Sequence, residues 1–73
     1  MSRTLKLHKD VYVGEAVDAA VAKFERFATF TLSDDQAHWV VAFEAHKPEL
    51  EKRIAGELSN FALGLTMEHR GRA

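Results

Sequence analysis

The chain has 73 residues, with ten basic and eleven acidic side chains and a net charge of −1. A protein that holds phosphate backbones usually carries a basic excess, so we expect no nucleic-acid partner. The chain contains no cysteine, which excludes disulfides, thiolate metal sites and cysteine nucleophiles. We expect a single domain over residues 1–73, and a domain this small buries only about 60% of the surface of its unfolded chain.

The first residues, Met-Ser-Arg-Thr-Leu-Lys, lack the apolar segment of a signal peptide. No apolar run approaches the roughly 20 residues that span a bilayer. The hydrophobic fraction of 47% is ordinary for a globular domain. These features predict a soluble, cytoplasmic protein without a membrane partner.

A strand and a helix are predicted in the first part of the chain. Leu5 and Leu7 alternate with polar residues, which predicts a half-buried strand over residues 3–8. From Gly14 to Phe27 the apolar residues recur at helical spacing, which predicts an amphipathic helix that covers another surface. Its apolar stripe consists of Val13, Ala16, Val17, Ala20, Phe24 and Phe27. The alanines favour close packing against a sheet.

A β-hairpin is predicted next. Ala28, Phe30 and Leu32 alternate with threonines, and β-branched residues favour strands. The polar residues 33–36 are typical of a turn, because their side chains bond nearby backbone groups. Alternation then resumes over residues 38–44, so the two strands form a hairpin.

The last element is a second long helix, predicted over residues 48–68. Pro48 suits its first turn, where no backbone N–H is needed. Its apolar residues recur at spacings of four, four, three and four: Leu50, Ile54, Leu58, Phe61 and Leu65. We expect residues 69–73 to form a basic, frayed tail.

The element order is therefore β-α-β-β-α, an α+β fold. We expect both helices on one face of a three-stranded sheet, with the third strand central and antiparallel to both others. This arrangement resembles a ferredoxin-like unit that lacks its last strand. The predicted core consists of Leu5, Leu7, Val17, Ala20, Phe24, Phe30, Leu32, Trp39, Val41, Phe43, Ile54, Leu58 and Phe61.

Catalytic motifs are absent from the sequence. There is no glycine-rich phosphate loop, no His-Glu-x-x-His motif and no nucleophile elbow, so we expect neither an enzyme nor a cofactor. His8, His38 and Glu44 would share the open face of the sheet and are weak candidates for a metal site. Zinc sites usually have three or four closely spaced ligands, which favours solvated or partner-facing histidines instead.

Two surfaces are candidates for partner binding. The open face of the sheet is either an ordinary solvated face or a docking platform, and the uncharged strand 28–32 offers an edge to an extended peptide. The outer side of the last helix carries either scattered apolar residues or a groove for a partner helix or a second copy. The candidate residues are Thr29, Thr31, His38 and Val40 on the sheet and Gly56, Asn60, Leu63 and Met67 on the helix.

Four segments spread over nearly the whole chain form a recognisable pattern. They are Asp10-Val-Tyr12, Ala16-Val17 with Phe24, Trp39-Val40-Val41, and Glu57-Leu58-Ser-Asn60-Phe61-Ala-Leu63. Together they resemble the HxsD family of His-Xaa-Ser system proteins. The resemblance implies an accessory protein in ribosomal peptide maturation, partnered by a radical S-adenosylmethionine maturase, a precursor peptide rich in His-Xaa-Ser repeats, or both.

The leading hypothesis from the sequence is thus a non-catalytic adaptor that holds a maturase or a precursor peptide. The chain itself lacks a His-Xaa-Ser repeat, so it is not the modified substrate. One alternative is a homodimer that serves a structural role without a separate client. Another is a regulator that binds a metal ion or small molecule through His8, His38 and Glu44.

Overall fold

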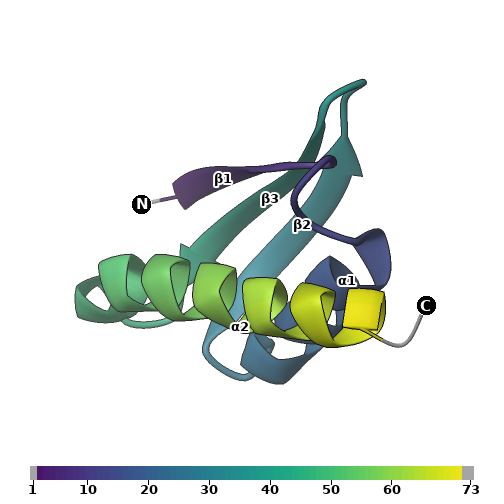
Figure 1. Cartoon of the computed structure of the whole chain (residues 1–73). Coiled ribbons are helices and arrows are strands. Elements are labelled where there is room, and N and C mark those ends of the chain that lie inside the picture. Colours follow the sequence, from purple (N-terminus) through teal and green to yellow (C-terminus); the bar gives the residue numbers. More distant parts are fainter. Residues whose placement is uncertain (1, 72–73) are drawn as a thin grey trace.

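The computed structural model describes residues 2–71 and contains one three-stranded sheet with two helices packed on it (Figure 1). The elements are β1 (Ser2–His8), α1 (Gly14–Phe24), β2 (Ala28–Asp34), β3 (His38–Ala45), the 3₁₀ turn η1 (Pro48–Leu50) and α2 (Glu51–Gly71). The strand order is β1-β3-β2, and β3 pairs antiparallel with both neighbours. The predicted α+β fold and central third strand are therefore confirmed.

The register of the sheet gathers apolar side chains on one face. Leu5 lies opposite Val41 in β3, and Phe30 lies opposite Phe43. Because side chains alternate between faces, the residues between these pairs point to the open face. A slip of one residue would move the apolar set of that strand into solvent, so burial fixes the register.

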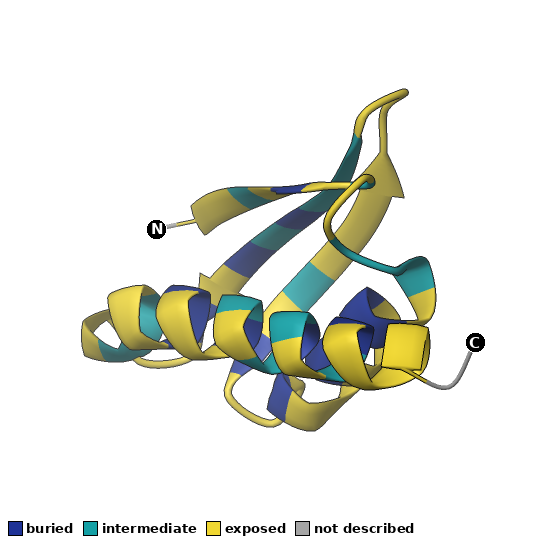
Figure 2. Cartoon of the chain, in the orientation of Figure 1, coloured by how far each residue is buried: buried dark blue, intermediate teal, exposed yellow. Residues whose placement is uncertain are grey.

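The core lies between this sheet face and the helices, where the buried residues in Figure 2 face one another. Ala20 in α1, Val41 in β3 and Leu58 in α2 are each 0% exposed and belong to one cluster. A second cluster surrounds Phe43 and Ile54 near the start of α2. Four residues of the predicted core are partly buried and pack against these clusters: Leu5, Phe30, Trp39 and Phe61.

Hydrogen bonds from distant elements fix the loop between β1 and α1. The Trp39 indole N–H donates to the backbone oxygen of Tyr12 at 2.9 Å. The backbone N–H of Val13 donates to the buried Thr66 hydroxyl oxygen at 3.1 Å. Val13 precedes α1 and has no side-chain cap of its own, so α2 supplies an acceptor at this helix start.

Leu32 is the predicted core residue that the structure contradicts, because it is 43% exposed. The hairpin formed by β2 and β3 projects beyond the helices at its turn (Figures 1 and 2), so no helix covers this part of β2. The alternation of residues 28–32 predicts the strand and its apolar face, but it does not show how far the helical layer extends.

Both predicted helix ends also differ from the structure. α1 ends at Phe24, and the backbone N–H of Phe27 closes a turn onto the Phe24 oxygen at 2.9 Å. α2 continues to Gly71, so the predicted frayed tail is wrong over residues 69–71, while residues 72–73 lie outside the described part. Arg70 donates to the backbone oxygen of Asp10 at 2.8 Å, which ties the last turn to the β1–α1 loop.

Within residues 2–71, no helix has the length and apolar character needed to cross a membrane.

Candidate partner-binding surfaces

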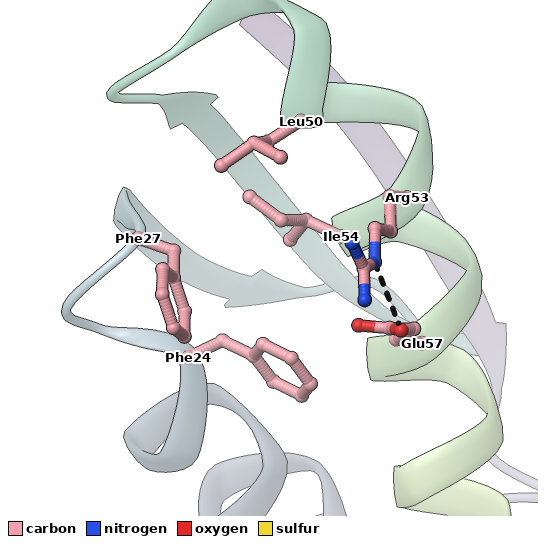
Figure 3. A pocket seen from close by; sticks show the side chains of 6 residues that line it. All are labelled: Phe24, Phe27, Leu50, Arg53, Ile54 and Glu57. Atoms are coloured by element: carbon pink, nitrogen blue, oxygen red, sulfur yellow. Dashed lines mark hydrogen bonds and ion pairs between the residues drawn. The ribbon is translucent and has the colours of Figure 1, made fainter.

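An apolar pocket opens between the end of α1 and the start of α2 (Figure 3). Phe24 and Phe27 form one side, and Leu50 and Ile54 form the other. Its volume is about 240 Å³, and nearly all of its accessible lining is apolar. Apolar and aromatic side chains are the usual lining of small binding sites in proteins.

The mouth of the pocket carries one ion pair. Arg53 and Glu57 lie one helical turn apart on α2, with the Arg53 Nε atom 3.1 Å from Glu57 Oε1. Both side chains are more than half exposed, so the pair contributes little to stability. It leaves one positive and one negative group beside the apolar lining.

Local chain geometry creates this pocket. Because α1 stops at Phe24, the turn that follows brings Phe27 to the surface, where it is 41% exposed. On the other side, Pro48 begins the 3₁₀ turn η1, which places Leu50 just before α2. The sequence does not predict the pocket, because helical spacing places Phe27 and Leu50 in the apolar stripes of two longer helices.

The outer edge of β2 is a second apolar feature. β2 is the last strand on its side of the sheet, and Leu32 is exposed along it. The other edge strand, β1, carries Arg3 and Lys6, whereas residues 28–33 of β2 are uncharged. Edge strands without charges are the ones most open to pairing with another chain.

The four sheet candidates lie on the open face, as their positions in the strands predicted. Thr29 and Thr31 are exposed, whereas His38 and Val40 are partly buried. They do not form one compact patch, because Thr29 pairs with Glu44 while His38 lies at the opposite end of β3. Val40 lies nearer the middle of this face, between Lys6 of β1 and Ser33 of β2, and Thr31 lies opposite Ala42.

The proposed metal-ligand set is not assembled. His8 and His38 are paired across the strands, with ring centroids 4.3 Å apart, but Glu44 lies opposite Ser2 at the far end of β3. A strand rises about 3.3 Å per residue, so the six residues from His38 to Glu44 span roughly 20 Å. Over residues 2–71, no three His, Cys, Asp or Glu side chains converge as ligands for a metal ion.

The hairpin turn beside these histidines is ordered by Asp35. Its carboxylate accepts backbone N–H bonds from Ala37 at 2.8 Å and from His38 at 2.7 Å. The His38 Nδ1 atom lies 3.2 Å from the same oxygen. These bonds lower the pKa of Asp35, the Ala37 N–H having the largest effect. The histidine pair is therefore attached to a well-defined turn.

The helix candidates lie along one side of α2, as predicted. Gly56, Asn60 and Met67 are exposed, and Leu63 is partly buried. Met67 is 67% exposed and is the most exposed large apolar residue in the described part of the chain. A Cβ atom added at Gly56 would meet no atom within 4 Å, so no neighbouring element forms a groove there.

Comparisons of the chain with protein-family models, with curated proteins and with solved structures found no match.

Proposed function

We propose that this protein is a non-catalytic accessory protein that binds a partner polypeptide. The observation that carries the proposal is the pocket between α1 and α2, which is lined by Phe24, Phe27, Leu50 and Ile54. Filling such a concave apolar site removes apolar surface from water, which is favourable. An apolar side chain of a partner protein fits the size of this site.

The pocket has the physical properties of an anchor site rather than a reaction site. Its walls supply dispersion contacts and exclude water from an inserted side chain. The charged groups that line it, Arg53 and Glu57, are paired with each other at the rim. An apolar wall and a charged rim are sufficient to bind an apolar residue that projects from a partner.

The resemblance to the HxsD family supports two candidate partners for this role. One is a radical S-adenosylmethionine maturase, and the other is a precursor peptide with His-Xaa-Ser repeats. The chain contains no cysteine for an iron–sulfur cluster, so radical chemistry would belong to the maturase. In the proposed system this protein brings the maturase and its substrate together.

The test uses purified maturase and a synthetic His-Xaa-Ser repeat peptide as separate probes, with affinities measured by isothermal calorimetry. Phe27→Ser should weaken binding of the true partner at least tenfold, because it removes the exposed part of the wall that Phe27 forms with Phe24. Val11→Ser is the matched control, since Val11 is 43% exposed and Phe27 is 41% exposed. Val11 does not line the pocket.

Circular dichroism of both variants establishes that they remain folded. Tight binding of a probe by folded Phe27→Ser, equal to the native affinity, would rule the pocket out. A third variant, Met67→Asp, tests the outer side of α2. If it weakened binding while Phe27→Ser did not, the line of Gly56, Asn60, Leu63 and Met67 would be the binding surface instead.

A further inference from the structure

The backbone of β2 presents unpaired hydrogen-bonding groups along its outer edge. The Asp35 N–H donates to His38 oxygen and the His46 N–H donates to Phe27 oxygen, both at 2.9 Å, just beyond the two ends of β2. Alternate residues of an antiparallel strand direct their backbone groups to the same neighbour. The odd-numbered residues 29–33 therefore bond to β3, and the backbone groups of residues 28, 30, 32 and 34 point outward.

The outward-directed groups lie beside apolar side chains. Phe30 and Leu32 lie on the helix side of β2. Phe30 is partly buried, and Leu32 is 43% exposed. Residues 28–33 contain no charge and no proline, so nothing in them opposes pairing. In β1, by contrast, Lys6 lies next to the centre of the strand and carries a charge. Its backbone is directed outward, because the Lys9 N–H bonds to the Ala37 oxygen and the odd-numbered residues of β1 therefore face β3.

We infer that β2 pairs antiparallel with β2 of a second copy of this chain. All seven residues of both strands pair only when Thr31, the central residue, lies opposite its own counterpart. In that register each Phe30 lies beside the partner's Leu32, and the two threonines face each other across the twofold axis. Aromatic–aliphatic and threonine–threonine pairs of this kind stabilise antiparallel strands.

Charge complementarity at the strand ends favours a second copy as the occupant. The Lys9 Nζ atom lies 2.7 Å from Asp34 Oδ2 in the same chain, and Asp34 would lie opposite the partner's uncharged Ala28. Arg26, two residues before β2, would lie beside the partner's hairpin turn with its Asp35. The twofold axis repeats this contact, and within the seven paired residues no like charges oppose each other.

The pairing would produce a continuous six-stranded sheet with both helical layers on the same face. One strand edge is a small interface compared with the roughly 1,600 Å² of a standard complex. The fraction of dimer should therefore depend on the protein concentration, with a dissociation constant in the micromolar range or above. This association is independent of the pocket and of the proposed partner.

Disulfide trapping tests both the pairing and its register, since the native chain has no cysteine. Thr31 would occupy a non-hydrogen-bonded pair, where Cα atoms lie about 4.5 Å apart, within the range that a disulfide bridges. Thr31→Cys should form a covalent dimer under mild oxidation. Thr29→Cys is the matched control, because it is exposed on the same face but would lie roughly 13 Å from its counterpart.

Sedimentation velocity measures the association without cross-linking. The native chain should shift from monomer to dimer as its concentration rises to several hundred micromolar, and Thr31→Lys should raise the dissociation constant at least tenfold by placing like charges opposite each other. Circular dichroism establishes that this exposed substitution leaves the domain folded. A native chain that stays monomeric over this range, or Thr29→Cys dimers that form as fast as Thr31→Cys dimers, would overturn the inference.

Discussion

Three glycines offer a sharp test of the packing, because the structure predicts opposite effects for the same substitution. Gly56 and Gly64 lie inside α2, and a Cβ atom at either position would meet no atom within 4 Å. Neither has a positive φ, so alanine adopts the same backbone without strain. Alanine is favoured over glycine within a helix by about 1 kcal/mol. Gly56→Ala and Gly64→Ala should therefore each stabilise the domain by that amount.

Gly14 provides the contrast. A Cβ atom there would lie 3.0 Å from two carbons of the Trp39 ring, closer than carbon atoms normally approach. The ring cannot move freely, because its indole N–H is bonded to the Tyr12 oxygen. Overpacking costs about 1–3 kcal/mol, and the gain in helix propensity is smaller at the first residue of α1 than inside a helix. Gly14→Ala should therefore destabilise the domain.

Thermal unfolding followed by circular dichroism measures these effects. For a domain of this size, 1 kcal/mol shifts the midpoint by about 4–8 °C. Gly56→Ala and Gly64→Ala should each raise the midpoint by that amount, and Gly14→Ala should lower it. A lower midpoint for Gly64→Ala would show that α2 is not exposed at that residue. A higher midpoint for Gly14→Ala would refute the contact with Trp39.

Two further perturbations test the core and the hairpin turn. Leu58→Ala, at a fully buried position, should cost about 2–5 kcal/mol in urea unfolding, and a loss below 1 kcal/mol would contradict its central place in the core. The lowered pKa of Asp35 means that its carboxylate stabilises the fold at neutral pH and that this contribution is lost as the pH falls below about 4. Native protein and Asp35→Asn should therefore differ in stability at pH 7, and this difference should shrink as the pH falls below about 4. A difference that does not change over this range would contradict this role.

The fold was predictable because its main signals are periodic and local. The alternation around Leu5 and Trp39 and the helical spacing of Ile54, Leu58 and Phe61 identify the faces that must be buried. With four connections and short loops, these faces allow few arrangements, and the antiparallel order β1-β3-β2 is the simplest. The error at Leu32 arose because strand alternation indicates a face of the sheet but not the extent of the layer above it.

The candidate surfaces were less predictable, because they depend on where elements stop. Ending α1 at Phe24 rather than Phe27 converts a buried stripe residue into one wall of a pocket. The metal hypothesis failed for a related reason. His38 and Glu44 share a face because their spacing is even, but an even spacing of six residues also separates them along the strand.

The proposed binding of a peptide in the pocket and the inferred pairing of β2 together predict that peptides with one and with two anchor residues bind differently. In the inferred dimer the two pockets lie on the same face, so a peptide with two anchor residues can occupy both. The second contact is then intramolecular, and its effective concentration raises the apparent affinity. Thr31→Lys should therefore weaken binding of a two-repeat peptide while leaving the affinity for a single repeat unchanged. Phe27→Ser should weaken both. If Thr31→Lys weakened binding of both peptides by the same factor, the strand edge itself would contact the peptide, which would remove the second copy from that edge. If it weakened neither, the peptide would not bridge the two pockets.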